Sequence, residues 1–284
     1  MKIQQTVIGV DLGGTNVRAG LVANGELQEQ ARRKISSDAP EDVVLTEIAR
    51  TIEDLINDET TAIGIGVPSV VDVKSGTVYD VVNIPSWKEV HLKQFLEDRF
   101  QVTAFVNNDV NCFVLGEHFF GSGRNHNNIV GLALGTGLGG GIIIDNRLYA
   151  GASCGAGEFG AIPYRDHTVE HYCSGEFFEA VHQTDGESVL KDAQLGDEGA
   201  LAMLDEFGEH LGNAIIMVLH AVDPELIILG GSVSNAFSFF EQGMYRQLQT
   251  FVFPRTIEAL KIVRSTLTNG AVLGAASLCL QQAD

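Results

Sequence analysis

Two glycine-rich stretches of this 284-residue chain have the residue types that can hold a phosphate group. The first is Gly13-Gly14-Thr15, and the second runs from Gly135 to Gly141 with Thr136 inside it. Glycine lets backbone N–H groups approach an anion closely, and a threonine hydroxyl adds another donor. Either stretch alone could be an ordinary β-turn. Two Gly-Thr turns in one chain favour a pair of phosphate-binding hairpins.

Gly135, Gly137 and Gly140 also match the spacing G-x-G-x-x-G of dinucleotide-binding folds. Such a fold needs a helix directly after the glycines, whereas Ile142-Ile143-Ile144 continues as a strand. The chain also has no G-x-x-x-x-G-K-S/T sequence, which is the signature of a P-loop. Phosphate binding is therefore expected at hairpin turns.

A carboxylate that could act as a general base is Asp109, in the sequence Asn108-Asp109-Val110-Asn111. This segment follows a strand-like run at residues 104–106 and begins a helical pattern. The carboxyl end of a strand is where parallel α/β folds expose reactive groups. Asp109 could there accept the proton of a hydroxyl nucleophile. The simpler alternative is that Asn108 or Asp109 only caps the helix.

The hydrophobic pattern predicts alternating strands and helices, which is typical of the α/β class. Strand-like runs occupy residues 6–12, 18–22, 62–66, 104–106, 129–134, 141–144 and 226–229. Helical patterns occupy residues 40–58, 92–99, 111–119, 197–219 and 271–280, the last with Asn269 as its expected N-cap. The strand–turn–strand plan around each glycine-rich stretch is the same, so we expect two similar sheets.

The chain length favours two domains. No Pro- or Ser-rich linker separates them, so the boundary is expected at a change of topology. We predict a small N-terminal α/β domain at residues 1–115 and a larger C-terminal α/β domain at residues 116–269. The C-terminal helix at residues 270–284 is expected to pack back on the first domain.

Composition excludes several classes of protein. The chain has 18 Lys and Arg against 37 Asp and Glu, a net charge of −19 that would repel nucleic acid. No apolar run reaches the roughly 18–20 residues of a membrane helix, and no signal peptide begins the chain. Cytoplasmic localisation is expected, without nucleic-acid or membrane partners. The scattered cysteines predict reduced, buried thiols; they are Cys112, Cys154, Cys173 and Cys279.

Five ordered segments resemble those of the ROK family, which comprises sugar kinases and related repressors of the actin/hexokinase superfamily. They are Asp11-x-Gly-Gly-Thr15, Gly64-x-Gly66-Val-Pro68, Asn108-Asp109-x-Asn111 through Gly116-Glu117, Leu134-Gly-Thr-Gly137-x-Gly-Gly-Gly141 and Ile228-Leu229-Gly230-Gly231-Ser232. Each segment alone is weakly specific, but the ordered set is specific and spans nearly the whole chain. The resemblance implies a two-domain, actin-like (ribonuclease H-like) ATPase fold with its active site in the interdomain cleft.

The resemblance also implies roles for individual residues, with ATP and Mg²⁺ as cofactors. Asp109 resembles the catalytic base, and Asn108 and Asp109 resemble ligands of sugar hydroxyls. Asp11 stands where the superfamily places a carboxylate near Mg²⁺. The two phosphate loops would comprise Gly13, Gly14 and Thr15, and Gly135, Thr136, Gly137, Gly139 and Gly140. Gly230 and Gly231 would lie on the adenosine side.

The chain departs from the family where a Glu-x-Gly-His motif and a Cys-rich zinc loop are expected. Glu158-Phe159-Gly160 is followed by Ala161 in place of the histidine, and residues 162–169 replace the three-cysteine loop. The possible donors in this stretch are His167, His171 and Cys173. Because tetrahedral zinc needs four ligands, we expect no structural zinc.

Glu158 and Glu170 remain candidate sugar ligands. The segment from Glu170 to Gly175 still resembles the family's Glu-x-Tyr-x-Ser-Gly. Carboxylates accept charge-assisted hydrogen bonds from neighbouring hydroxyls, and a site built this way rejects analogues that lack them. The missing imidazole at Ala161 removes one contact, which affects the identity of the sugar more than the reaction.

The resemblance thus implies an ATP-dependent hexose kinase that acts on the 6-hydroxyl, with glucose as the leading substrate and a homodimer as the expected assembly. N-acetylmannosamine, N-acetylglucosamine, mannose and fructose remain alternative substrates, and polyphosphate remains an alternative donor. One rival is a sugar-sensing regulator, although the family's repressors carry an N-terminal DNA-binding domain and this chain starts at the first hairpin. Another rival is an actin-like filament ATPase, which would have no use for Glu158 and Glu170.

Overall fold

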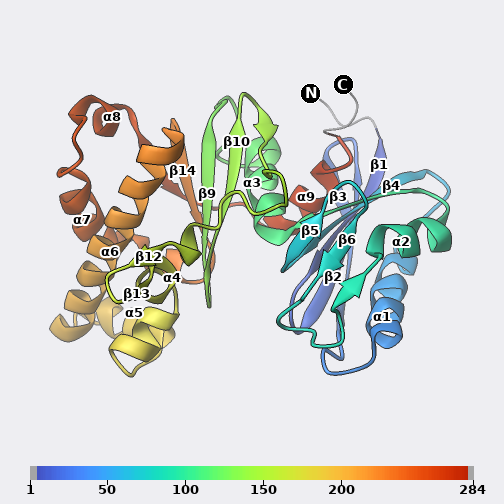
Figure 1. Cartoon of the computed structure of the whole chain (residues 1–284), viewed down its shortest axis with the longest axis horizontal. Helices are drawn as coiled ribbons and strands as arrows, with labels where there is room; N and C mark the ends of the chain where they lie inside the picture. The colour runs from blue at the N-terminus through green and yellow to red at the C-terminus, as the bar shows by residue number, and fades with distance from the viewer. Residues whose placement is uncertain (1–4, 281–284) are drawn as a thin grey trace. The chain divides into compact units, whose positions relative to one another are not determined.

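The computed structural model of the protein describes residues 5–280, which form two compact units (Figure 1). The first unit takes the chain up to Asn125, the segment Arg147–Ala156 and the chain from Leu267 onward. The second unit takes His126–Asn146 and Gly157–Thr266. These boundaries differ from those predicted after residues 115 and 269. Residue 115 lies inside helix α3 (Asp109–Phe120), whose backbone hydrogen bonds keep it in one unit.

A mixed sheet of five strands forms the centre of the first unit, in the order β3-β2-β1-β4-β8. Its strands are β1 (Thr6–Leu12), β2 (Asn16–Ala23), β3 (Glu26–Lys34), β4 (Thr60–Val67) and β8 (Thr103–Asn108). β2 is antiparallel to β1 and β3, whereas β1, β4 and β8 run parallel. The carboxyl ends of β1, β4 and β8 therefore lie at the same edge of the sheet.

Successive residues of β1 face two different apolar cores, because side chains alternate across a strand. Ile8 packs in a core with residues of α1 (Glu41–Glu53) and α2 (Leu92–Phe100). Val7 packs on the opposite face with residues of α9 (Gly270–Ser277). The unit is completed by short strands, namely β5 (Val70–Asp72), β6 (Thr77–Tyr79), β7 (Glu89–Val90) and β11 (Arg147–Leu148).

Helix α9 packs directly on this sheet because two strand residues are glycines. A Cβ at Gly9 would lie 2.0 Å from the carbonyl oxygen of Val272, and one at Gly64 would lie 1.8 Å from that of Ala275. Such distances are too short for real atoms, so only glycine fits at both positions. Asn269 occupies the predicted N-cap position of α9, but its φ is 58° and its side chain makes no capping hydrogen bond.

The second unit contains a sheet with the strand order β10-β9-β14-β15. These strands are β9 (Ile129–Leu134), β10 (Leu138–Ile144), β14 (Leu226–Gly230) and β15 (Lys261–Arg264). β9 and β10 form an antiparallel hairpin, and β14 runs parallel to β9 and β15. β1, β2, β4 and β8 have the same arrangement in the first unit, as the repeated turn sequence predicted.

Helices and short segments complete the second unit. In chain order they are η1 (Phe159–Ala161), β12 (Pro163–Tyr164), β13 (His167–Thr168), α4 (Val169–Cys173), the π-helix η2 (Phe177–Val181), α5 (Gly186–Gln194), α6 (Glu198–Val222), η3 (Val233–Ala236), α7 (Phe237–Leu248) and α8 (Pro254–Ala259). Within residues 5–280, no helix is both long and apolar enough to span a membrane.

Candidate active site

Asp109 is the first residue of α3 and directly follows β8. The N-cap is Asn108, whose Oδ1 accepts hydrogen bonds from the backbone N–H groups of Val110 (2.8 Å) and Asn111 (3.2 Å). Oδ1 of Asp109 also accepts from the N–H of Val110, at 2.9 Å. Because Asn108 is the cap, helix capping does not account for an aspartate at position 109. The junction places this carboxylate at the carboxyl edge of the sheet.

A buried amide network supports the junction, and the sequence analysis did not find it. Asn107 is 3% exposed, and its Oδ1 accepts from the N–H of Asn108 (2.8 Å), from Nδ2 of Asn111 (2.9 Å) and from the thiol of Cys154 (3.3 Å). Cys154 belongs to the segment Arg147–Ala156, so this contact helps to join that segment to the first unit. These hydrogen bonds hold the backbone of Asn108 in place and thereby orient Asp109, while the buried Oδ1 of Asn111 has no hydrogen-bond partner among the described residues. The only sequence signal was an extra asparagine before Asn108.

Asp11 lies at the same edge of the sheet. It pairs with Gly66 of β4, and a Cβ at Gly66 would lie only 3.3 Å from the Cα of Asp109. Burial raises the pKa of the Cys112 thiol, and the negative charges of Asp109 and Asp11 raise it further. Both carboxylates therefore lie near the start of α3. Burial also raises the pKa of Asp11, an effect that the positive charge of Arg18 opposes.

Gly13, Gly14 and Thr15 form the turn between β1 and β2, at the carboxyl end of β1. The N–H of Gly13 donates to the carbonyl oxygen of Asn16 (2.9 Å), and the N–H of Ile35 donates to that of Thr15 (3.0 Å). Thr15 itself is exposed. Hydrogen bonds thus fix the backbone of the turn, while the threonine faces solvent.

Gly135, Thr136 and Gly137 form the equivalent turn between β9 and β10 in the second unit. Glu170 contacts this turn, because its Oε2 accepts a hydrogen bond from the N–H of Leu138 at 2.7 Å. A Cβ at Gly137 would lie 2.3 Å from the same oxygen. Glycine at position 137 therefore makes room for Glu170. A residue predicted to bind the sugar thus also contacts the predicted phosphate turn.

Gly139 and Gly140 lie in β10, beyond the turn in which the sequence analysis placed them. Gly140 is buried, and a Cβ there would lie 2.5 Å from the carbonyl oxygen of Gly157. Close packing therefore requires glycine at position 140. Residues 135–137 form the turn itself, and the role of the half-buried Gly139 in phosphate binding stays a prediction.

A cavity of about 650 Å³ opens beside this second turn. Its walls include residues 135–137, Glu170, Phe178 and the segment after β14 with Ser232 and Asn235. The volume is in the range of small-molecule sites. The sequence analysis missed most of these lining residues. Its last motif reached the cavity wall only at Ser232.

Gly230 and Gly231 position that wall of the cavity. Gly230 ends β14, and Gly231 has a φ of +81°, which favours glycine. A Cβ at Gly231 would also lie 2.2 Å from the carbonyl oxygen of Leu134. The two glycines let the chain turn sharply from β14 into Ser232 and η3.

Glu158 lies just before η1 and close to Glu170. Displacement of water by neighbouring atoms raises the pKa of Glu158, and the negative charge of Glu170 raises it further. Ala161 ends η1 and is exposed. The predicted residues thus fall into two groups. Asp11, residues 13–15, Asn108 and Asp109 meet in the first unit, and residues 135–137, Glu158 and Glu170 meet in the second.

The model of the ROK family matches residues 7–282. The chain belongs to the ROK family. It is 30% identical to the glucokinase of Thermotoga maritima, over 96% of each protein. It is also 26% identical to the xylose repressor of Bacillus spizizenii, over 96% of this chain and 77% of the repressor.

A solved ROK structure has the same fold. The ROK family glucokinase from Streptomyces griseus, in complex with glucose and AMPPNP, is 26% identical to this chain and matches it with a TM-score of 0.80. The match covers 96% of this chain and 98% of the other. This ROK chain therefore has the actin-like ATPase fold, as the motifs predicted.

The resemblance to ROK proteins implies a zinc site, but the residues of this ROK chain do not fit one. The rings of His167 and His171 are stacked with centroids 4.1 Å apart, and Nδ1 of His171 lies 2.9 Å from Oε1 of Glu176. Cys173 is fully buried, and burial raises its pKa, whereas zinc binds the thiolate. Among residues 5–280, no three His, Cys, Asp or Glu side chains are grouped as metal ligands.

The purified ROK protein is expected to contain no stoichiometric zinc, and a chelator should leave its Tm unchanged. The physical reason is that the donor set lacks the thiolates that make such sites tight. Elemental analysis and thermal melting with and without EDTA measure both effects. One zinc ion per chain would show that the prediction is wrong.

Proposed function

We propose that this ROK sugar kinase transfers the γ-phosphoryl group of ATP to the 6-hydroxyl of a hexose, and that glucose is the substrate. N-acetylmannosamine, N-acetylglucosamine, mannose and fructose are the alternatives. The observation that carries the proposal is the β8–α3 junction, where Asn108, not Asp109, caps the helix. A carboxylate held in this way suits proton transfer from a hydroxyl.

Asp109 accepts the proton of the 6-hydroxyl as the oxygen attacks the γ-phosphorus in line. Asp109 lies in the first turn of α3, where the helix dipole interacts favourably with a carboxylate. Asn108 and Asp109 also share hydrogen bonds with sugar hydroxyls. These contacts orient the nucleophile, which supplies much of the rate enhancement in phosphoryl transfer.

The two turns hold the phosphate groups of ATP. Backbone N–H groups of Gly14, Thr15, Thr136 and Gly137, with the two threonine hydroxyls, bind phosphate oxygens as negative charge develops. The N–H groups of Gly13 and Gly135 donate to carbonyl oxygens within the turns and fix their shape. Adenosine occupies the cavity of the second unit, whose wall Gly230 and Gly231 position. Asp11 is the residue that would hold Mg²⁺, since Mg²⁺ prefers carboxylate oxygens, and a bound ion would neutralise phosphate charge.

An ADP-release assay with a panel of hexoses tests the proposal. Glucose is expected to give the highest kcat/KM, and the product should carry its phosphate on the 6-hydroxyl, as ³¹P and ¹³C NMR would show. Substituting polyphosphate for ATP tests the donor. No turnover with any hexose would refute the kinase proposal. Sugar binding without turnover would instead favour a sugar-sensing regulator. The similarity of this chain to the xylose repressor supports testing that alternative.

Ala161→His tests the alignment through the segment that departs from the family. If the pocket has the family geometry, the added imidazole should lower the glucose KM by about 2- to 13-fold, the value of one neutral hydrogen bond. If His167 or His171 already supplies that contact, the variant should crowd the site and raise the KM. An unchanged KM would show that position 161 does not face the sugar.

We further propose that the enzyme is a cytoplasmic homodimer. ATP and free hexoses are cytoplasmic substrates, and the −19 net charge disfavours a nucleic-acid partner. Sedimentation velocity of the purified chain would measure the assembly, and a monomer at micromolar concentration would contradict the dimer.

A further inference from the structure

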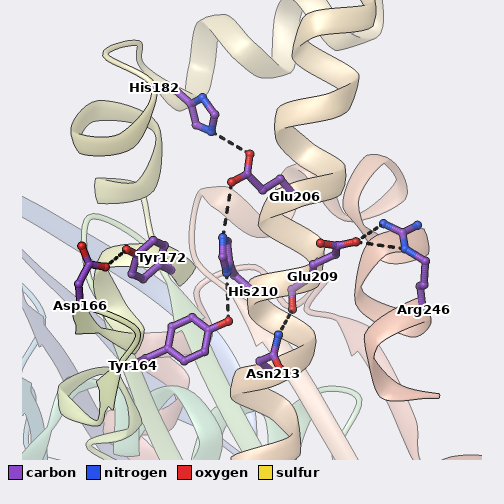
Figure 2. A network of polar contacts seen from close by, with 9 residues as sticks. All are labelled: Tyr164, Asp166, Tyr172, His182, Glu206, Glu209, His210, Asn213 and Arg246. Carbon is purple, nitrogen blue, oxygen red and sulfur yellow. Dashed lines mark hydrogen bonds and ion pairs between the residues drawn. The ribbon is translucent and has the colours of Figure 1, made fainter. Parts of the chain in front are cut away.

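A chain of polar contacts in the second unit crosses from α6 to the segment that carries Glu170 (Figure 2). The Tyr164 hydroxyl lies 3.1 Å from Nδ1 of His210. Nε2 of His210 lies 3.7 Å from Oε1 of Glu206, whose other oxygen lies 3.3 Å from Nε2 of His182. Figure 2 shows Glu206 between the two imidazoles. Nε2 of His210 therefore faces Glu206 of its own helix at ion-pair distance without a hydrogen bond, and Nδ1 meets the hydroxyl of Tyr164 in β12.

Tyr172 of α4 makes a second contact with the same histidine. Its ring centroid lies 4.8 Å from that of His210, and its hydroxyl donates a hydrogen bond to Asp166. The rings of Tyr172 and Tyr164 meet edge to face at 5.5 Å. His210 is 1% exposed and Tyr172 is 8% exposed. A buried histidine thus contacts both the hairpin and the helix that follows it.

Nδ1 of His210 can accept the hydrogen bond of the Tyr164 hydroxyl when the imidazole ring is neutral. Burial lowers the pKa of His210 and the positive charge of Arg165 lowers it further, while the carboxylates of Glu206 and Glu209 oppose this shift. With the ring proton on Nε2, facing Glu206, Nδ1 is the acceptor for the tyrosine hydroxyl.

The segment held by these contacts has little regular structure of its own. β12 and β13 have two residues each, and α4 has five, so their internal hydrogen bonds are too few to fix them. Helix α6 has 25 residues. Arg246 of α7 pairs with Asp205 (2.5 Å) and Glu209 (2.8 Å) of α6. We therefore expect α6 to keep its position without the segment, whereas β12, β13 and α4 need their contacts with α6 to stay in place.

Glu170 lies in α4, two residues before Tyr172. Its carboxylate reaches the second turn through the hydrogen bond from Leu138. A small rotation of α4 would move this carboxylate, because the side chain projects from a helix of little more than one turn.

We propose that His210 is a positioning residue for Glu170: through Tyr164 and Tyr172 it fixes α4, and so holds the Glu170 carboxylate at Leu138 and toward the sugar. This inference rests on the proposed function, in which Glu170 binds sugar hydroxyls. The network occupies the segment that stands in this chain where the family has its zinc loop. In place of a metal ion, the hydrogen bond of Tyr164 and the ring contact of Tyr172 hold that segment against α6.

Kinetic constants of His210→Ala and Tyr164→Phe test the proposal. Both variants should raise the sugar KM about 3- to 10-fold, the value of one buried hydrogen bond, and change kcat and the ATP KM less than about 2-fold. His210→Asn should recover at least half of the loss, because its amide oxygen stands near the position of Nδ1. The matched control is His220→Asn, an exposed histidine of the same helix, which should leave the sugar KM unchanged.

Amide exchange of Leu138 gives a second readout that does not require activity. Its N–H is protected by Glu170 and should exchange faster in Tyr164→Phe and His210→Ala, while the β9 amides keep their protection. If His210→Ala does not fold, the sugar KM and the Leu138 exchange of Tyr164→Phe decide whether the proposal holds, since this variant removes one oxygen atom only. A lower Tm with unchanged sugar KM and unchanged Leu138 exchange would overturn the proposal. If the wild type phosphorylates no hexose, the kinase proposal fails, and Leu138 exchange alone decides the role of His210.

Discussion

Asp109→Asn is expected to lower kcat by about 10²–10⁴-fold, the usual contribution of a general base, while sugar binding and Tm change little. Asparagine has nearly the same shape and keeps an oxygen for the N–H of Val110, which Oδ1 of Asp109 now accepts at 2.9 Å. Its amide cannot take a proton from the 6-hydroxyl. Steady-state kinetics with saturating ATP and glucose measure the effect.

The matched control is Asp98→Asn, which makes the same change at an exposed position of α2 in the same unit. Its kcat should equal that of the wild type. If Asp109→Asn kept more than a third of wild-type kcat, Asp109 would not be the base. A large fall in Tm would instead indicate that the carboxylate mainly supports the β8–α3 junction.

The second large effect is expected on sugar binding. Glu158→Gln and Glu170→Gln should each raise the sugar KM by about 10- to 150-fold, because each loses a charge-assisted hydrogen bond of about 1.5–3 kcal/mol. The ATP KM should change much less. Glutamine at position 170 still offers an oxygen to the N–H of Leu138, so the phosphate turn should keep its shape.

Initial rates over a matrix of glucose and ATP concentrations separate the two constants. Glu258→Gln, an exposed change on α8 of the same unit, is the control and should leave both unchanged. A rise in the ATP KM without a rise in the sugar KM would show that these carboxylates belong to the nucleotide site.

The parts of the fold that the sequence predicted well are those that depend on local pattern. The strands at residues 6–12 and 129–134 have the bounds of β1 and β9, because an apolar run that ends at glycine is a strong local signal. The helix after Asn108 was also predicted from a local signal, because a capping residue precedes an apolar pattern. β3 was missed because its residues are mostly exposed and polar, so no apolar alternation marks it.

The candidate site shows the same division. The order of the Gly-Thr turns, Asn108-Asp109 and the segment at residues 228–232 could be read from the sequence, and the ordered motifs sufficed to predict the family that the comparison confirmed. The sequence did not show which residues of one type bind a ligand and which serve packing. Gly140 was predicted to line a phosphate loop, yet it is a packing residue within β10, and only its neighbours in space distinguish the two uses.

The fold class, the two hairpin turns and the carboxylate at the start of α3 could all be predicted, because each depends on residues adjacent in the chain. The distant residues that support them are seen in the folded structure alone. Asn107 meets a thiol 47 residues away, and Leu138 meets a carboxylate 32 residues away. Such contacts form when whole elements pack, and their partners depend on the path of the backbone through both units, which no local pattern of residue types encodes.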